Sequence, residues 1–284
     1  MRDIEPRLTP ARSDLAAERL RGRVEAARFV PGEVRRVAAP LAPLRRSPRS
    51  DAPLDTEALA GDVVTVYEET IEGWAWGELD RDGYVGYLPA DMLGPADPAP
   101  THHVTALKTF VYPAAEMKLP PLAALPLGAG VTVVGETEKR GLTYALLASG
   151  HAVVARHLAP LDAAQSDFVA VAERLIGVPY LWGGTSSFGI DCSGLVQLAL
   201  RLTGRTVLRD TDLQEKTVGA PVSIEDGRLR GDLLFWPGHV AIMLDGTRMI
   251  HASGFHMEVV VEDVAAAAAR IAAGGVQLSS VRRL

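Results

Sequence analysis

The chain has 284 residues, of which 48% are hydrophobic and 23% charged, and its formal net charge is −6. This length exceeds the usual size of one hydrophobic core, so two or three domains are expected, and the composition excludes a disordered or fibrous protein. An acidic chain without a basic stripe predicts no binding to nucleic acid or to an anionic membrane, and a single cysteine excludes an internal disulfide.

The N-terminal segment, residues 1–32, is predicted to be a helical extension. Within it, residues 13–29 carry apolar side chains at roughly the spacing of an amphipathic helix. The first 24 residues contain no apolar run suited to a secretory signal, and the apolar stretch 264–272 is too short to cross a bilayer. A cytoplasmic protein is therefore expected.

A β-rich region follows. The segment 40–53 is rich in Pro, Arg and Ser and is predicted to be a loop. Residues 61–93 consist of short strand-like runs separated by turn residues, among them the pair Asp82-Gly83. Strands of this length predict a small SH3-like barrel, assigned to residues 33–97.

A second β-rich region repeats the first. Residues 128–160 align with it without gaps when shifted by 67 positions, so that Gly61 meets Gly128 and Gly83 meets Gly150. This predicts a duplicated small β domain over residues 98–161. The first copy has aromatic residues where the second does not, so the first is expected to bind a ligand, with simple core packing as the alternative. These aromatic residues are Trp74, Trp76 and Tyr84.

The remaining residues, 162–284, predict an α+β domain. Residues 162–177 have apolar residues on one helical face and end at a glycine, and a second helix is expected to end at Gly204. The runs GDLLFWPGHVAIML and TRMIHASG are predicted to be strands buried on both faces. Helices that precede a small sheet are typical of an α+β fold.

The only cysteine, Cys192, lies between Asp191 and Ser193, directly before the apolar run LVQLALRL. Its sulfur is therefore expected near a helix N-terminus, where free amides and the helix dipole favour the nucleophilic thiolate. A lone cysteine is more often inert packing, but polar neighbours and a preceding glycine-rich loop favour a reactive site.

A thiolate nucleophile needs a base and a group that orients the base. His239 and His251 are the candidates, because two antiparallel strands joined at Asp245-Gly246 would bring both rings to one face. A zinc site is the rival chemistry, but no Cys-x-x-Cys or His-Glu-x-x-His spacing occurs. The pair Gly183-Gly184 lacks the remainder of a phosphate-binding loop.

Five motifs carry a resemblance to a known family: GVPYLWGG, DCSGLVQ, GDLLFW, GHVAIML and IHAS. With these motifs in this order, the region from residue 162 onward resembles the NlpC-type family of papain-like cell-wall cysteine peptidases. The preceding β regions resemble the bacterial SH3-like domains found in γ-D-glutamyl-L-diamino acid endopeptidases. The resemblance implies a papain-like catalytic domain preceded by two small all-β barrels. No metal, given the residue spacing, and no cofactor are expected.

The resemblance also implies the reaction. Cys192 would attack the amide between the γ-carboxyl of D-glutamate and a diamino acid in murein peptides, with His239 as the base and His251 as its orienter. The main-chain amide of Cys192 and the hydroxyl of Tyr180 would stabilise the oxyanion. The expected setting is the recycling of murein peptides such as L-Ala-γ-D-Glu-diaminopimelate.

Members of this architecture require a free N-terminal L-alanine. The resemblance assigns the substrate ammonium to Asp191 and to the first SH3-like domain, where the candidates are Glu68 or Glu69 and Tyr84, with Ser193 and Thr211 assisting. Two other functions are kept open, namely amidase or acyl-transfer activity on another substrate and non-catalytic binding of wall fragments. The sequence does not specify the oligomeric state or the preference between diaminopimelate and lysine.

Overall fold

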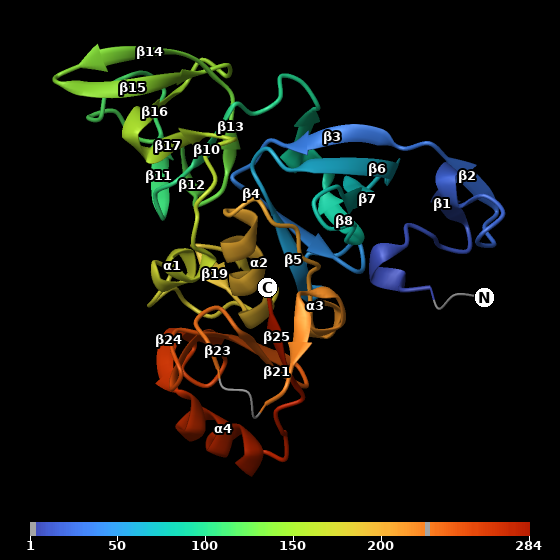
Figure 1. Ribbon diagram of the computed structural model, residues 1–284. Helices are drawn as coiled ribbons and strands as arrows, with labels where there is room; N and C mark the ends of the chain where they lie inside the picture. The colour runs from blue at the N-terminus through green and yellow to red at the C-terminus, as the bar shows by residue number, and fades with distance from the viewer. Residues whose placement is uncertain (1–3, 225–227) are drawn as a thin grey trace. The chain divides into compact units, whose positions relative to one another are not determined.

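The computed structural model describes residues 4–224 and 228–284 (Figure 1). By its internal contacts the chain forms two compact units, Met1–Ala163 and Ala164–Leu284. Over residues 4–163 the first unit contains strands and short 3-10 turns but no α-helix, whereas the second unit combines strands with four α-helices in its described part. The structure is therefore mixed, with an all-β unit followed by an α+β unit.

The N-terminal segment is extended, so the predicted helix over residues 13–29 is wrong. Strands β1 (Leu15–Ala17) and β2 (Arg28–Val30) pair in parallel, with the 3-10 turn η2 (Glu18–Leu20) between them. Gly22 has a φ of 78°, which is incompatible with a continuous right-handed helix. All three residues of β1 are buried, so packing against the first β domain outweighs the weak helical pattern.

The first β domain is a seven-stranded sheet in the order β5-β4-β8-β7-β6-β3-β9. Its core is formed by small and branched apolar residues, including Leu44, Val64, Leu79 and Leu88. The strands are β3 (Glu33–Val37), β4 (Leu41–Arg45), β5 (Leu54–Leu59), β6 (Val63–Glu69), β7 (Trp74–Leu79), β8 (Val85–Pro89) and β9 (Leu93–Pro95).

Strand β4 lies in the segment 40–53 that was predicted to be a loop, and this prediction is wrong for residues 41–45. Ala42 and Leu44 are fully buried and alternate with partly exposed residues, which is the pattern of a strand with one buried face. The four proline residues and three arginine residues of the segment hid this alternation, and Pro43 lies within the strand itself.

The second β region has its own core and repeats the order of elements of the first. The predicted shift of 67 positions relates β8 to β16, but the turn and strand that follow are shifted by 65, so the alignment is not free of gaps to residue 160. Gly61 and Gly128 have φ values of 82° and 85°, and Gly83 and Gly150 have values of 75° and 83°, so matched glycines occupy matched turns. The strands are β10 (His102–Val104), β11 (Lys108–Val111), β12 (Ala123–Pro126), β13 (Gly130–Val131), β14 (Val133–Lys139), β15 (Leu142–Leu147), β16 (Ala152–Val154) and β17 (Leu158–Pro160). A common origin of the two regions stays a prediction.

The second unit is built on a six-stranded sheet in the order β20-β25-β21-β22-β23-β24. All of its pairings are antiparallel. The strands are β20 (Ala220–Val222), β21 (Leu233–Trp236), β22 (His239–Met243), β23 (Arg248–Ser253), β24 (Glu258–Asp263) and β25 (Ser280–Arg283), and a small hairpin is formed by β18 (Thr185–Ser186) and β19 (Gly189–Ile190).

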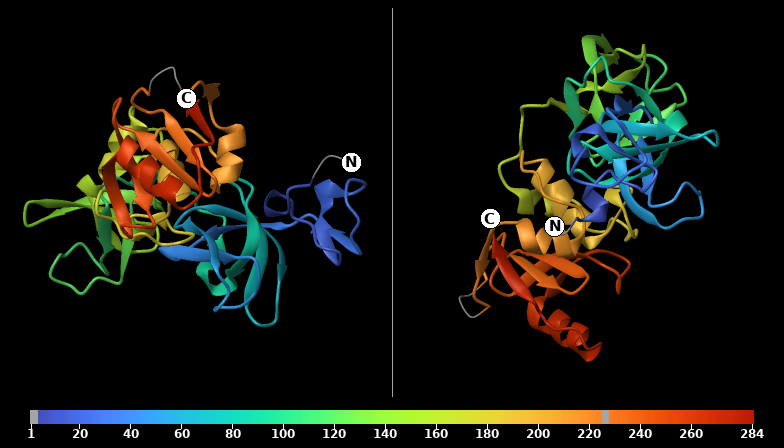
Figure 2. Two further views of the ribbon diagram at one scale, coloured as in Figure 1. Left: turned by 90° about the horizontal axis from the view of Figure 1, so that it is seen from below. Right: turned by 90° about the vertical axis from the view of Figure 1, so that its right-hand side faces the viewer.

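Helices cover both faces of this sheet. Helix α4 (Val264–Ala273) packs on one face, against Leu234, Trp236 and neighbouring residues (Figure 2). Helix α2 (Cys192–Arg201) packs against β22 and β23, and also against α1 (Phe168–Glu173) and α3 (Thr211–Thr217). The predicted burial of both faces of β21 and β22 is confirmed. No helix in residues 4–224 and 228–284 is long and apolar enough to cross a membrane.

Candidate active site

Cys192 is the first residue of α2, as the sequence predicts. Asp191 caps the helix, since its carboxylate accepts a hydrogen bond of 2.8 Å from the amide of Gly194. Gly194 is required here because a Cβ at this position would collide with the carbonyl oxygen of Gly184 in the preceding loop. The glycines of the motif therefore allow the loop and the start of the helix to approach closely around the thiol.

The two histidines are brought together by the hairpin of β22 and β23, as predicted. Nε2 of His239 lies 2.7 Å from Nδ1 of His251. This contact leaves Nδ1 of His239 as the ring nitrogen available to the thiol. The Cys192 sulfur lies 4.0 Å from the carbonyl oxygen of Gly238, directly before His239 in the chain.

A third residue continues the chain of hydrogen bonds. Nε2 of His251 lies 2.7 Å from an oxygen of Glu262 on β24, and the same oxygen accepts a hydrogen bond of 2.6 Å from Arg270 on α4. The second Glu262 oxygen lies 3.2 Å from Nε2 of His256. The sequence analysis missed Glu262. The strand pairing would have indicated it: Val260 on β24 pairs with His251, and Glu262, two positions further along β24, lies on the same face of that strand.

The charges of the thiol and the base differ from the sequence-based expectation. Burial, assisted by the nearby carboxylate of Asp191, raises the pKa of Cys192 to about 12. Burial also lowers the pKa of His239 to about 3, with further contributions from His251 and Arg270. The backbone amide of Ser193 at the start of α2 acts to lower the pKa of the thiol, as expected, but burial acts in the opposite direction and is the larger effect. Thiol and imidazole are both neutral at rest.

Asp191 is part of a buried ion pair that the sequence analysis did not foresee. One carboxylate oxygen accepts hydrogen bonds from Arg209 at 2.6 Å and from the Gly183 amide at 2.9 Å. The other accepts from the Gly194 amide and, at 3.2 Å, from the Ser193 hydroxyl. Four donors use about the full acceptor capacity of a carboxylate. Nothing in the sequence near Arg209 signals this contact.

Comparison with known proteins agrees with this geometry. Residues 44–93 match the bacterial dipeptidyl-peptidase SH3 domain, and residues 177–271, which contain the cysteine, both histidines and Glu262, match the NlpC/P60 family. Residues 177–271 form an NlpC/P60 domain. This domain is a cysteine peptidase domain, and the family recognised from the five sequence motifs is confirmed.

Individual relatives cover different parts of the chain. Dipeptidyl-peptidase 6 of Lysinibacillus sphaericus is 42% identical over 103 residues, which are 36% of this chain and 38% of the relative. The γ-D-glutamyl-L-lysine dipeptidyl-peptidase of Bacillus subtilis is 28% identical over 230 residues, covering 72% of this chain and 73% of the relative. A solved NlpC/P60 family protein from Bacillus cereus shares the fold with a TM-score of 0.73 at 21% identity, over 88% of this chain and 99% of that one.

Tyr180 and Thr211, two further predicted site residues, also lie in the unit that holds the NlpC/P60 domain. Tyr180 is half-buried, and burial, followed by electrostatic effects of the neighbouring Cys192 and Asp191, raises its pKa. Its phenol therefore keeps the proton that an oxyanion donor needs. Thr211 is the half-buried first residue of α3. Gln214 on the same helix donates to the carbonyl of Ser193 at 3.0 Å, which ties α3 to the start of α2.

The residues predicted in the first β domain have structural roles there. Glu68 lies 2.5 Å from Arg12 and 2.5 Å from Arg28, so its carboxylate is already paired with two cations. Tyr84 is 3% exposed and belongs to the core of the β domain. Trp76 is equally buried, and Tyr84 and Trp76 together also line a cavity of about 380 Å³ in the first unit, so their role in ligand binding stays a prediction. Glu69 is exposed and lies 3.7 Å from Arg35.

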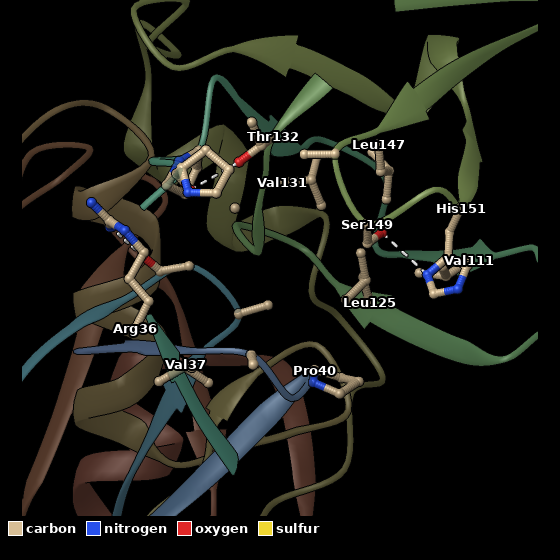
Figure 3. A pocket seen from close by; sticks show the side chains of 18 of the residues that line it. Arg36, Val37, Pro40, Val111, Leu125, Val131, Thr132, Leu147, Ser149 and His151 are labelled. Atoms are coloured by element: carbon tan, nitrogen blue, oxygen red, sulfur yellow. Dashed lines mark hydrogen bonds between the residues drawn. The ribbon is translucent and has the colours of Figure 1, made fainter. Parts of the chain in front are cut away.

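Two cavities help to locate the chemistry. A cavity of about 600 Å³ is formed within the first unit by mainly apolar residues of the two β regions, including Val37, Val131 and Leu147 (Figure 3). No residue of the NlpC/P60 domain lines it. A smaller cavity of about 200 Å³ is lined by His239 and His251 themselves. Among residues 4–224 and 228–284, no group of three His, Cys, Asp or Glu side chains is arranged to hold a metal ion.

Proposed function

We propose that this protein is a cysteine endopeptidase that hydrolyses the amide between the γ-carboxyl of D-glutamate and a diamino acid in murein peptides with a free N-terminal L-alanine. The observation that carries the proposal is the hydrogen-bonded chain His239–His251–Glu262 beside Cys192, within an NlpC/P60 domain. The name of the Bacillus subtilis relative, a γ-D-glutamyl-L-lysine dipeptidyl-peptidase, supports the bond type.

The first step of the proposed reaction starts from the neutral thiol of Cys192 and the neutral imidazole of His239. As the substrate carbonyl approaches, Nδ1 of His239 takes the thiol proton and the Cys192 sulfur attacks the carbonyl carbon. The imidazolium that forms is stabilised through His251 by the carboxylate of Glu262, which lies 2.7 Å from His251. With the pKa of the thiol raised and that of His239 lowered by burial, we expect the proton to move from sulfur to His239 as the substrate binds.

The tetrahedral intermediate then collapses. Its oxyanion accepts hydrogen bonds from the main-chain amide of Cys192 and from the Tyr180 hydroxyl. His239 returns its proton to the nitrogen of the diamino acid, the C–N bond breaks, and an acyl thioester remains on Cys192. Water, deprotonated by His239, attacks the thioester and releases the γ-D-glutamyl product and the thiol.

Recognition of the free amine is the part of the proposal that depends most on local electrostatics. Asp191 supplies a buried negative charge next to the nucleophile, although Arg209 and three other donors already bind this carboxylate. A substrate ammonium would share one of its oxygens, with Ser193 and Thr211 as further polar groups. Short released peptides with free amines, as arise in cytoplasmic murein recycling, are the substrates that such a site would select.

Two other functions remain as alternatives. The same Cys and His roles serve amidases and acyltransferases, and a transacylated product without free diamino acid would favour that function. Non-catalytic binding of wall fragments would be favoured if peptide bound without turnover. The intact chain of hydrogen bonds from His239 to Glu262 favours the enzyme, because simple binding does not need an oriented base.

Amine dependence tests the proposal. We would measure kcat/KM for L-Ala-γ-D-Glu-diaminopimelate and for the same peptide acetylated at its N-terminus, with Cys192→Ala as the control. The free peptide should be cut at the γ-D-glutamyl bond and the acetylated one far more slowly. Equal rates would contradict amine recognition, and intact peptide in both reactions would contradict the peptidase itself.

A further inference from the structure

The cavity of about 600 Å³ in the first unit has no part in the proposed reaction. It lies where the two β regions meet, and there the amide of Gly130 donates to the carbonyl of Ala60 at 2.7 Å. Glycines allow this approach, because a Cβ on Gly61 would lie 2.8 Å from the ring of Pro100 and 3.1 Å from the Cα of Gly130. The two β regions are therefore packed directly against each other at the cavity.

The walls of the cavity are mainly apolar. Val37 of the first β region and Val111, Leu125, Val131 and Leu147 of the second surround the hollow in Figure 3. Apolar walls, a few fixed polar groups and a volume of about 300–1,000 Å³ are typical of sites for small molecules. An apolar ligand placed here would be removed from water together with these side chains, which favours binding.

Arg36 supplies the positive charge of the lining. Its Nη1 donates to the carbonyl of Gly61 at 2.9 Å, and its Nε donates to the carbonyl of Ala96. Both acceptors are neutral, and within residues 4–224 and 228–284 no carboxylate forms an ion pair with Arg36. The guanidinium is thus held by the main chain, while its charge and its Nη2 donors remain available to a ligand.

The preceding residue, Arg35, differs from Arg36 in this respect. Both residues belong to β3, but successive side chains of a strand point to opposite faces, and Arg35 does not line the cavity. Arg35 also donates to two main-chain carbonyls, but carboxylate oxygens of Glu33 and Glu69 each lie 3.7 Å from its Nη1. The charge of Arg35 is therefore compensated within the protein, and that of Arg36 is not.

Asp97 is the acidic residue of the lining, and it limits what the ligand can be. Asp97 is exposed, so water screens its carboxylate, whereas Arg36 is partly buried. In the part of the chain that the structure describes, Asp97 forms no ion pair either. One partly buried cation and one exposed anion suit a ligand with a single negative charge better than a doubly charged phosphate.

We infer that this cavity binds a small monocarboxylic acid with an apolar body, its carboxylate on Arg36 and its body between the valine and leucine side chains. A guanidinium whose orientation is fixed by other hydrogen bonds is suited to a carboxylate. The carboxylate has two possible sources, a medium-chain fatty acid or the C-terminus of a short apolar peptide. No residue of the NlpC/P60 domain lines the cavity, so the inference does not depend on the proposed function.

Titration calorimetry of the full chain tests the inference with four probes: octanoate, 1-octanol, octylammonium and acetate. Octanoate should bind roughly 10- to 100-fold more tightly than 1-octanol, the range of a charge-assisted hydrogen bond. It should also bind more tightly than octylammonium, which has the wrong charge, and than acetate, which lacks the apolar body. N-acetyl-leucyl-leucine then distinguishes the sources, because tighter binding than that of octanoate would favour a peptide C-terminus.

Variants assign the preference to Arg36. Arg36→Gln should bring the affinity for octanoate down to that for 1-octanol, whereas the matched control Arg35→Gln should keep the full preference. Ala148→Phe, at an exposed position of the lining, should weaken the binding of both probes because the ring fills part of the cavity. Asp97→Asn should bind octanoate at least as tightly as the wild type.

Four results would overturn the inference. Absence of binding of every probe would remove the site, and equal affinity for octanoate and 1-octanol would leave an apolar cavity without a carboxylate group. A preference for octanoate that persists in Arg36→Gln would exclude Arg36. Tighter binding of octylammonium that is lost in Asp97→Asn would make this a cation site. Cys192→Ala should bind octanoate like the wild type, so none of these results bears on the peptidase.

Discussion

Nε2 of His239 lies 2.7 Å from Nδ1 of His251, and this one contact fixes which nitrogen of His239 faces the nucleophile. Glu262 holds the far side of His251 at the same distance, and Arg270 and His256 hold Glu262. Burial works to raise the pKa of Glu262, but these hydrogen bonds outweigh it and lower the pKa, so the carboxylate stays ionised. His251 thus orients the base His239, and Glu262 in turn orients His251.

Removing the charge of Glu262 tests whether the hydrogen-bonded chain from His239 through His251 to Glu262 supports the base. Glu262→Gln keeps a hydrogen-bonding side chain of the same size but loses the charge that stabilises the His239–His251 pair when it is protonated. We expect kcat to fall, by up to about 10⁴-fold as for the carboxylate that orients the base of a Ser-His-Asp triad, with little change in KM. Steady-state kinetics would show this. Glu258→Gln, at an exposed position of the same strand, should be close to wild type, and equal losses in both variants would contradict the role of Glu262.

The neutral thiol can be tested by alkylation, because Cys192 is the only cysteine and labelling is site-specific. Its pKa is raised to about 12, so the thiolate is scarce near neutral pH and increases as the pH rises toward that value. The rate of reaction with iodoacetamide should therefore rise steadily with pH between about 7 and 10. A fast rate that is independent of pH in this range would indicate a stable thiolate–imidazolium pair instead.

Tyr180→Phe tests the oxyanion assignment. The substitution removes the phenolic proton and little volume, so folding should be unaffected while the transition state loses a donor. Loss of one such donor typically lowers kcat by about 10²–10³-fold. Turnover measured with saturating peptide would show the effect, and an unchanged kcat would exclude Tyr180 from the oxyanion site.

Arg209 is expected to matter for stability. It is 1% exposed and pairs with Asp191, so Arg209→Met leaves a buried carboxylate without its cation. Breaking a buried ion pair in this way costs about 3–5 kcal/mol of the free energy of unfolding, measurable by urea denaturation. Arg230→Met, which breaks partly exposed ion pairs with Asp167 and Glu173, should cost about 1 kcal/mol or less. Similar losses in both variants would contradict a special role for Arg209.

The sequence identified the parts of the site that depend on local pattern. Cys192 follows from a capped helix start, and His239 and His251 follow from two strands joined by a tight turn, since alternation along a hairpin determines which side chains share a face. The shift that relates the two β regions could likewise be read from matched glycines.

What the sequence missed depends on contacts between distant segments. Arg209 lies 18 positions from Asp191, and no local motif links them. Glu262 lies on the strand that pairs with the strand of His251, and the sequence analysis did not extend the hairpin to this next strand. Residues 13–29 resemble a helix in spacing, but their apolar side chains pack against Trp76 and Tyr67 as extended chain. The pKa of Cys192 does not follow from the sequence, because the sequence shows the helix dipole but not the depth of burial that raises the pKa.

The most direct test of the central claim is mass spectrometry of the products formed from L-Ala-γ-D-Glu-diaminopimelate. The wild-type protein is predicted to release L-Ala-D-Glu and free diaminopimelate in equal amounts, and Cys192→Ala is predicted to release neither. Cleavage between alanine and glutamate, or release of the same products by Cys192→Ala, would contradict the claim that Cys192 hydrolyses the γ-D-glutamyl bond.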